Sequence, residues 1–384
     1  MYLMHKDKMV AKFNLYKNKP FEFIDIYDEN ELPIGLRGNI HFASNNLMAW
    51  HSRRCIPNGR LNIKEIEQAL ENYGSIDEVS LSSFGLSLND TYWYKPENSE
   101  LSWDTINFRD NEFNESLFEL ETIDKILNPN MSPDFRTNGA LNKMWIISDG
   151  RPCLIKSGDI DGITNNSGIL AANEIVASQI ATLLGLDAVE YLKLNLNGFE
   201  TNYCISECFI NYDEDFVTGN DLLDQFNSKD SNKLYKFIGE KCGFNDELDK
   251  MIVLDVLLHN QDRHEDNYGI ILDANTGDIK RFAPIFDTGN CLAWNGVIEE
   301  DNMKFPKRNR KDCLTKLKSK IELPNINEIK EVITDIYDEF KISEKQIELA
   351  LADMSAGYDY LQKFNHNPQI GLGFDINSLF EEEI

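Results

Sequence analysis

Residues 254–287 read LDVLLHNQDRHEDNYGIILDANTGDIKRFAPIFD, and this stretch decides the fold that the sequence predicts. The apolar run that leads into it predicts a buried helix ending near His259, with core positions at Leu248, Ile252, Val256 and Leu258. Two apolar segments, 269–272 and 279–282, flank the turn residues Asn275, Thr276 and Gly277, which is typical of a β-hairpin. A polar loop therefore joins a helix to a hairpin, and Asp287 follows the hairpin.

Three polar residues of this stretch, Asp262, Asn267 and Asp287, have the order and rough spacing of a phosphoryl-transfer site. Four residues separate Asp262 from Asn267, which is the interval of a kinase catalytic loop. Phosphoryl transfer needs a carboxylate that orients or deprotonates the attacking hydroxyl, and oxygen ligands that hold magnesium on the phosphates. We therefore expect Asp262 to be catalytic, and Asn267 with Asp287 to bind Mg²⁺.

Two other interpretations of the same residues remain open at this point. Asp and Asn favour turns because their side chains form local hydrogen bonds, so all three residues could simply shape loops. His259 and His264 could instead bind a metal, although they lie across a predicted helix end and no cysteine falls at zinc spacing from them.

The upstream sequence contains the lysine and the acid that a nucleotide site needs. Segments 145–148 and 153–156 flank a turn at 149–152 and predict a hairpin whose second strand ends in Lys156. Residues 171–184 predict a helix that stops at Gly185, and Glu174 near its start could pair with Lys156. The alternatives are a solvent-exposed lysine at a strand end and an acid that favours the first turn of a helix.

Two further segments could contact a nucleotide. In residues 135–143 a single glycine, Gly139, lies before the first hairpin, where a phosphate-covering loop belongs, and Thr137 and Lys143 are candidates for phosphate contact. The β-rich run 203–210 lies where a kinase has its hinge, so backbone groups around Glu207 and Phe209 could bind adenine. A buried core strand is the alternative for this second segment.

The composition of the whole chain argues against several classes of protein. Its 384 residues carry a formal net charge of −27, which disfavours nonspecific binding to nucleic acid or anionic membranes. The basic run 304–311 is the exception, and we interpret it as a solvated loop. The seven cysteines are scattered, no signal peptide is evident and no apolar run could span a membrane, so we expect a cytoplasmic protein with reduced thiols.

Residues 260–267, followed by Ala283-Pro-Ile-Phe-Asp287, resemble the HipA-type serine/threonine kinases, which include toxins of toxin–antitoxin pairs and CtkA-type kinases. The Asp-Arg-His-x-x-Asn signature is also similar to that of phosphoinositide kinases. The resemblance covers about residues 135 to 295 and implies ATP and Mg²⁺ as cofactors. It also implies a phosphate loop at 139–143, an ATP-binding lysine at Lys156, a helix acid at Glu174 and a hinge at 207–209.

The chain departs from the family pattern in two places. Arg136 stands where the family has a regulatory autophosphorylated serine, and Thr137 is one residue away. Arg263 and His264 follow Asp262, whereas in eukaryotic protein kinases the His-Arg pair precedes the aspartate. We therefore expect His264 to brace the loop and not to act in catalysis.

Taken together, the sequence predicts an α+β, two-lobed, protein-kinase-like fold. The expected parts are an accessory α/β region at 1–130, an N-lobe at 131–210 and a mainly helical C-lobe at 211–384, with a helix that opens at Ser343. The expected function is that of an ATP-dependent serine/threonine protein kinase. Lipid or small-molecule kinases, and a nucleotide-binding interaction module without transfer, are the alternatives. Expected partners are a protein with a Ser/Thr acceptor and an antitoxin, without direct nucleic-acid or membrane binding.

Overall fold

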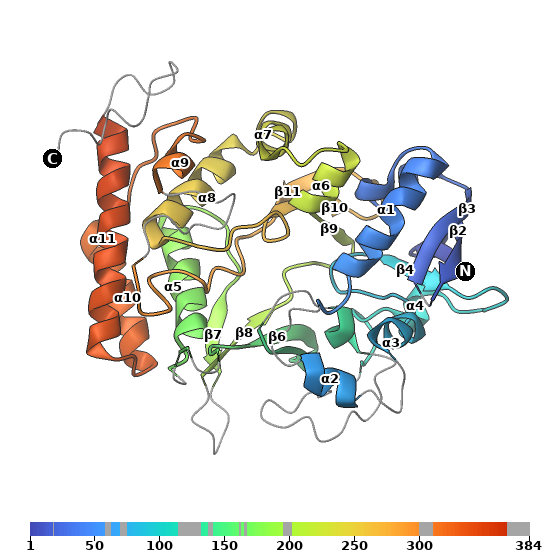
Figure 1. The fold of residues 1–384 in the computed structure, drawn as a ribbon, viewed down its shortest axis with the longest axis horizontal. Helices are drawn as coiled ribbons and strands as arrows, with labels where there is room; N and C mark the ends of the chain where they lie inside the picture. The colour runs from blue at the N-terminus through green and yellow to red at the C-terminus, as the bar shows by residue number, and fades with distance from the viewer. Residues whose placement is uncertain are drawn as a thin grey trace. The chain divides into compact units, whose positions relative to one another are not determined.

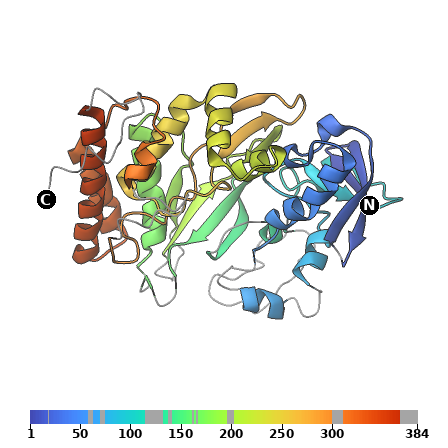
Figure 2. The same cartoon turned by 45° about the horizontal axis from the view of Figure 1, so that its top comes forward.

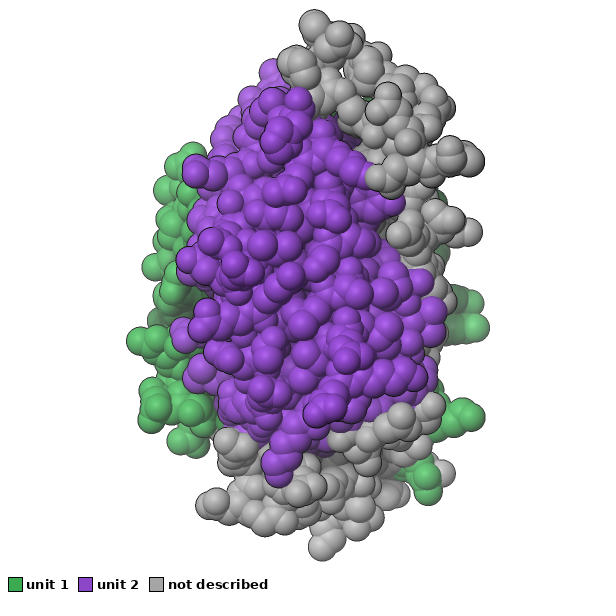
Figure 3. Space-filling model, turned by 90° about the vertical axis from the view of Figure 1, so that its left-hand side faces the viewer, with its two compact units in different colours: residues 1–156, 207–234, 270–281 green, residues 157–206, 235–269, 282–384 purple. Residues whose placement is uncertain are grey.

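The computed structural model of the chain describes residues 1–17, 19–57, 63–69, 75–113, 132–136, 141–160, 163–164, 167–194, 202–298 and 310–366. These residues form two compact units, each assembled from segments that are distant in sequence (Figure 3). Unit 1 comprises residues 1–156, 207–234 and 270–281, and unit 2 comprises residues 157–206, 235–269 and 282–384.

Unit 1 begins with a four-stranded sheet in the order β3-β2-β1-β4, formed by β1 (Tyr2–His5), β2 (Lys8–Tyr16), β3 (Lys19–Ile26) and β4 (Tyr92–Lys95). Helix α1 (Ile40–Arg53) lies over this sheet (Figure 2). The helix starts at Asn39, whose Oδ1 accepts hydrogen bonds from the backbone N–H groups of His41 and Phe42. Apolar side chains of both elements form one buried core, among them Phe13, Phe23, Leu47 and Tyr94.

The rest of unit 1 is built from short elements. Its helices are α2 (Ile63–Ala69), α3 (Ile76–Ser82), α4 (Trp103–Ile106), α6 (Gly219–Gln225) and most of α7 (Ser231–Lys236). A hairpin is formed by β5 (Lys143–Ser148) and β6 (Arg151–Ser157). Its turn has Asp149 at φ 50° and Gly150 at φ 77°, the left-handed pair that tight hairpins favour. A three-stranded sheet in the order β11-β10-β9 contains β9 (Glu214–Thr218), β10 (Gly269–Asp273) and β11 (Ile279–Phe282).

Unit 2 is mainly helical. Its elements are α5 (Ile169–Leu183), the antiparallel strands β7 (Tyr191–Leu194) and β8 (Tyr203–Glu207), a π-helical turn (Phe237–Lys241), α8 (Asn245–Leu258), α9 (Arg310–Leu314), α10 (Ile326–Glu339) and α11 (Glu344–His366). Helices α10 and α11 pack on each other, and they also pack against α5 and α8 (Figure 1). Helix α5 is apolar on nearly all sides and is followed by Gly185 at φ 64°.

The structure confirms most of the predicted elements. The helix before His259, both hairpins and the helix stopped by Gly185 are present, and Ser343 Oγ accepts a hydrogen bond from the Gln346 backbone N–H at the start of α11. The mixture of helices with antiparallel sheets confirms an α+β fold. The two-lobed arrangement and the domain boundaries at 130 and 210 stay predictions.

Three whole-chain expectations can also be compared with the structure. All seven cysteines are free thiols. Within the residues described, no helix combines the length and apolar character needed to cross a bilayer. Most of the basic run 304–311 lies outside the described residues, but Arg310 is described and is buried against Asp353 instead of facing solvent.

Candidate active site

The candidate catalytic loop begins where α8 ends. His259 adopts a left-handed backbone conformation, with φ 53°, and so stops the helix. The next residue, Asn260, is buried; its Nδ2 donates to Asp255 Oδ1 at 2.8 Å, and its Oδ1 accepts from the Asp262 backbone N–H at 3.1 Å. Because a buried polar group left without a partner costs about 1–3 kcal/mol, these bonds fix the turn that presents Asp262.

His259 is a structural residue. Its side chain is fully buried, with Nδ1 at 2.9 Å from Asp353 Oδ1 on α11. Arg310 Nη2 reaches the same carboxylate oxygen at 2.5 Å, so Asp353 joins the end of α8 to α9. His259 is fully buried, and among the described residues no group of three or more His, Cys, Asp and Glu side chains could hold a metal, which argues against the metal site with His264 that the sequence left open.

Arg263 connects the loop to two other segments. This buried guanidinium binds the Asp255 carboxylate of α8 through Nε and Nη2, at 3.1–3.3 Å. Its Nη1 donates to the carbonyl oxygens of Asn267 at 3.1 Å and Phe286 at 2.9 Å, and its Nη2 donates to Thr288 Oγ1 at 2.8 Å. Burial alone would lower the pKa of Arg263, but the charge and hydrogen bonds of Asp255 raise it above its ordinary value. A permanent cation therefore holds the loop beside the segment that carries Asp287.

The expected role of His264 as a brace is confirmed only within the loop. Its carbonyl oxygen accepts from the Asn267 backbone N–H at 2.8 Å, and its ring Nδ1 accepts from the Asp266 N–H at 3.3 Å. Arg263 makes the contacts that reach other elements, and sequence reasoning did not assign it that role.

Asp262 and Asn267 lie together in this loop. Asn267 Nδ2 donates to the Asp262 carbonyl oxygen at 3.0 Å, and Asn290 Nδ2 donates to Asp262 Oδ2 at 3.1 Å. Because Oδ2 of Asp262 accepts this hydrogen bond, Oδ1 is the carboxylate oxygen that could accept a proton from a substrate hydroxyl. Because the amide nitrogen of Asn267 is engaged, its Oδ1 is the atom that could bind a cation.

Asp287 is held by strand and helix neighbours of unit 2. Just before it, Ile285 pairs with Ala188 in a parallel bridge, and Asp287 itself has φ 55°, a region that Asp tolerates better than most residues. Just after it, the Thr288 backbone N–H donates to Glu174 Oε2 at 2.9 Å. Glu174 is therefore buried and bound to the segment of Asp287, whereas its predicted pairing with Lys156 stays a prediction.

The residues around Asp287 suit magnesium better than zinc. Asn267 offers an amide oxygen and Asp287 a carboxylate, and Mg²⁺ typically takes one or two carboxylates together with water and phosphate oxygens. Among the described residues, no group of three or more His, Cys, Asp and Glu side chains could hold a metal by itself. This donor set fits a cation that also needs ligands from a bound nucleotide.

The predicted lysines of unit 1 are not exposed. Lys143 and Lys156 are direct partners in the β5–β6 register, and they are only 8% and 3% exposed. Two like charges therefore lie opposite each other in a buried part of the hairpin. The solvent-exposed alternative for Lys156 is wrong. Thr137 and Gly139 lie outside the described residues.

The two predicted hinge residues differ from each other in the structure. The Glu207 side chain is half exposed and pairs with Arg151 at 2.6 Å on the surface. Phe209 packs on Phe216, with ring centroids 5.6 Å apart, and its carbonyl oxygen accepts from Arg281 Nη2 at 3.0 Å. The Phe209 carbonyl is therefore engaged, and so is the Cys208 backbone N–H, which donates to the Pro152 carbonyl oxygen at 2.9 Å.

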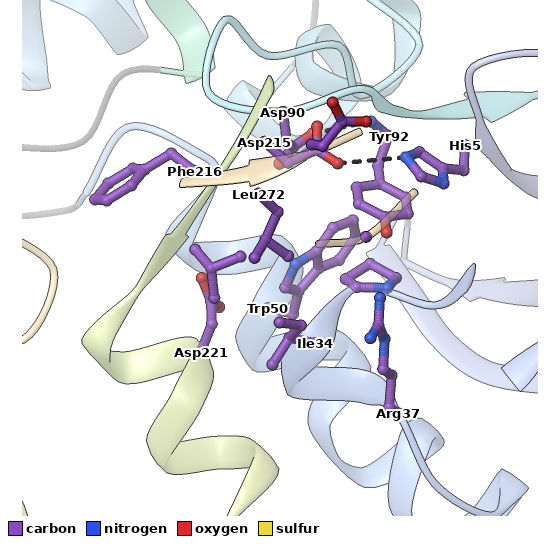
Figure 4. Close-up of a pocket in the computed structure, with 14 residues that line it drawn as sticks. His5, Ile34, Arg37, Trp50, Asp90, Tyr92, Asp215, Phe216, Asp221 and Leu272 are labelled. Carbon is purple, nitrogen blue, oxygen red and sulfur yellow. Dashed lines mark hydrogen bonds and ion pairs between the residues drawn. The ribbon is translucent and has the colours of Figure 1, made fainter. Parts of the chain in front are cut away.

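Unit 1 also has a pocket that involves none of the predicted site residues (Figure 4). Its lining includes His5, Trp50, Tyr92 and Asp215, and an ion pair joins His5 Nε2 to Asp215 Oδ2 at 3.3 Å. Burial alone would lower the pKa of His5, but the hydrogen bonds and charges of Asp215 and Glu31 raise it. His5 and Asp215 therefore form an ion pair in the wall, which also contains Arg37 and the further carboxylates Asp90, Asp221 and Asp273.

Besides Arg263, sequence reasoning assigned no role to two other residues of the site, Asn173 and Asn290. Asn173 Nδ2 donates to the carbonyl oxygens of Gly289 and Cys291, and Asn290, which lies between these two residues, donates to Asp262 Oδ2. A signal existed for Asn173, since it is a polar residue within the otherwise apolar run of α5. Asn290 gave no such signal, because asparagine in a loop is ordinary.

Comparisons with known proteins give a fold but no family model. No protein-family model matches the sequence, and no curated protein matches it. Among solved structures, HipA of Shewanella oneidensis MR-1, determined with HipB and operator DNA, is similar with a TM-score of 0.55 and 12% identity over 100% of both chains. The proinflammatory kinase CtkA of Helicobacter pylori is similar with a TM-score of 0.46 and 21% identity, over 62% of this chain and 95% of CtkA. The chain has the fold of HipA, as its signature residues led us to expect.

Proposed function

We propose that the chain is an ATP- and Mg²⁺-dependent kinase of the HipA type that phosphorylates a serine or threonine hydroxyl of a protein. The observation that carries this proposal is the position of Arg263. It binds the backbone of Asn267 and of Phe286, the residue before Asp287, and it directly follows Asp262. One buried cation thus connects all three residues that phosphoryl transfer requires.

Each residue has a separate task in the proposed reaction. Asp262 Oδ1 orients the acceptor hydroxyl and takes its proton as the bond to phosphorus forms. Asn267 Oδ1 and the Asp287 carboxylate hold magnesium, which neutralises charge on the phosphates when bound. Lys156 and Lys143 supply positive charge for the phosphate oxygens, and the backbone near Glu207 holds the base.

The proposed acceptor is a protein and not a lipid. A lipid kinase of the same machinery must approach an anionic membrane surface, which a chain of net charge −27 repels on average. The HipA structure contains HipB, so we also propose an antitoxin-like protein partner for this chain. That structure also contains operator DNA, so the comparison gives no support to the expected absence of nucleic acid.

The test is transfer from radiolabelled ATP in three parallel reactions, with a casein-like protein, with phosphoinositide vesicles, and without an acceptor. Label on the protein supports the proposal, and label on the lipid supports a lipid kinase. Nucleotide binding without transfer in any reaction would leave a nucleotide-binding interaction module.

The matched control for this assay is Asp262→Asn, which keeps the size of the side chain and removes the carboxylate. We expect nucleotide binding to persist and transfer to fall by about 10²- to 10⁴-fold, the usual contribution of a positioned general base. Transfer within a few-fold of the wild type would show that Asp262 is only a turn residue.

A further inference from the structure

Asn173 is a buried amide whose hydrogen bonds all reach other segments. It lies on α5 with no exposed surface, and its Nδ2 donates to the carbonyl oxygens of Gly289 at 3.0 Å and Cys291 at 2.7 Å. Its Oδ1 accepts from the Tyr337 hydroxyl of α10 at 2.5 Å. Both donors and the acceptor of one side chain are therefore used to hold a loop against two helices.

The loop comes very close to α5 at Gly289. A Cβ atom at this position would lie 2.8 Å from the Leu170 carbonyl oxygen, so only glycine fits without a shift. The Cys291 N–H donates to the Gly289 carbonyl oxygen at 2.9 Å, which makes the loop a tight turn. The residue at the centre of this turn is Asn290.

Asn290 contacts the catalytic loop through its backbone carbonyl and through its side-chain amide nitrogen. Its backbone carbonyl accepts from the Gln261 N–H at 2.9 Å, and its Nδ2 donates to Asp262 Oδ2 at 3.1 Å. The first contact fixes the distance between the two loops, and the second fixes the rotation of the Asp262 carboxylate.

We propose that Asn290 is a positioning residue for Asp262, and that Asn173 holds Asn290 in place through the two carbonyls that flank it. The inference rests on the proposed function, because it concerns the same carboxylate. With Oδ2 held by an amide, the Asp262 carboxylate presents Oδ1 to the acceptor in one orientation. Tyr337 extends the same hydrogen-bonded path to α10, about 75 residues after Asp262 in the sequence.

The test compares the steady-state kinetics of phosphate transfer from ATP to the casein-like protein for Asn290→Ala, Asn290→Asp and the wild type. We expect kcat to fall by about 10- to 100-fold, the cost of a reacting group misplaced by about 1 Å, with KM for ATP nearly unchanged. Asn290→Asp keeps the shape but replaces the donor with a carboxylate that repels Asp262, so its kcat should be at least as low. A residue that only fills space would tolerate Asn290→Asp.

The same change at an exposed asparagine, Asn327→Ala on α10, is the control and should leave kcat unchanged. Asn173 is too buried for a safe truncation, so Tyr337→Phe tests the outer part of the path. It removes one hydroxyl, and we expect a smaller loss of kcat, again without a change in KM for ATP.

The possible failures can be told apart. If the wild type transfers phosphate and the Asn290 variants match it in kcat, the positioning role is wrong and the kinase remains. If KM for ATP rises together with the loss of kcat, Asn290 supports the nucleotide site in general and the proposal is also wrong. If the wild type transfers no phosphate at all, the proposed function fails and the positioning role fails with it.

Discussion

The residues on either side of Asp287, the proposed metal ligand, hold its backbone in place. Its left-handed backbone lies between Ile285, which pairs with Ala188, and Thr288, whose N–H is bound by Glu174. Residues in sparsely populated backbone regions persist only where their surroundings hold them, and they are common at functional sites. The position of Asp287 is therefore fixed from both sides before any ligand binds.

For Asp287→Ala we expect the loss of magnesium-dependent stabilisation by ATP. A ligand that binds only the folded state raises its melting temperature, and the carboxylate is the charged ligand for the cation. The measurement is a thermal-shift titration with ATP alone and with ATP plus magnesium. Asp273→Ala, on the hairpin of unit 1, is the matched control. An equal magnesium gain in Asp287→Ala and wild type would show that Asp287 only shapes a turn.

For Lys156→Met we expect weaker ATP binding, slower transfer or both, with the apo melting temperature little changed. A lysine at the phosphates makes charge-assisted hydrogen bonds that methionine cannot make, while methionine has a similar length for the buried site. Lys156→Arg should not restore binding, because a planar guanidinium does not replace a compact ammonium in a buried position.

Calorimetry with ATP and the apo melting curve decide this case together. If affinity, transfer and melting temperature of Lys156→Met all equal those of the wild type, the lysine has no part in nucleotide binding. A large fall in melting temperature alone would show that Lys156 serves the β5–β6 hairpin.

At the scale of elements, the sequence predicted well what depends on local pattern. Helix α8 and the β10–β11 hairpin follow from an apolar run and from a glycine turn, and both were predicted with their order. Contacts between distant segments could not be predicted this way. Asn173 binds carbonyl oxygens more than 110 residues away, and nothing in the spacing of α5 indicates which loop will pass its asparagine.

Because local sequence does not show contacts between distant segments, it also did not reveal the burial of Lys156 or the contacts of Phe209. Burial of Lys156 was not evident, because a lysine at a strand end is usually solvated and only the packed structure decides otherwise. Backbone groups around Glu207 and Phe209 were predicted to bind adenine, and one of them, the Phe209 carbonyl, is bound by Arg281 of β11. Such competition between partners depends on side chains that the local sequence does not bring together.

The sheet of β9, β10 and β11 contains a buried carboxylate that binds both of its outer strands. Glu214 at the start of β9 binds Arg281 at 2.8 Å and Lys280 at 3.0 Å, both on β11, and accepts from the Asn211 backbone N–H at 3.1 Å. Burial alone would raise the pKa of Glu214, but the Arg281 hydrogen bond and the other donors lower it from 4.5 to about 2. The link between the two outer strands of the sheet is therefore strongest while Glu214 is ionised.

Glu214→Gln should lower the melting temperature most at neutral pH. Because the pKa of Glu214 is lower in the folded state, its contribution is complete above the unfolded-state pKa of 4.5 and is lost as the pH falls toward about 2. Melting curves of both proteins from neutral pH to about pH 3 should show the difference shrinking on the acid side. A difference that does not depend on pH would mean that the glutamine disturbs packing and that the charge is unimportant.

At the scale of the whole molecule, charge is the dominant feature. The 65 acidic residues outnumber the 38 basic residues, and the resulting repulsion opposes the compact state. Helix α10 shows the effect locally, because it has no basic residue in its last turn and carries exposed acids at four-residue intervals, at Glu331, Asp335 and Glu339. Like charges at this spacing repel, and acids at a helix C-terminus oppose its dipole.

Raising the concentration of sodium chloride should therefore stabilise the protein. Between about 20 mM and 200 mM salt the Debye length falls well below the distance between most surface charges, so repulsion among them is screened. If screening recovers about 1 kcal/mol, the melting temperature of a chain of 384 residues should rise by about 1 °C. The control is a variant in which the exposed acids of α10 are replaced by Gln or Asn, and it should gain less from salt than the wild type. Equal gains in both proteins would place the salt effect elsewhere on the surface. A fall in melting temperature would show that exposed attractive ion pairs, such as Arg151–Glu207 and Lys318–Glu240, outweigh the repulsion.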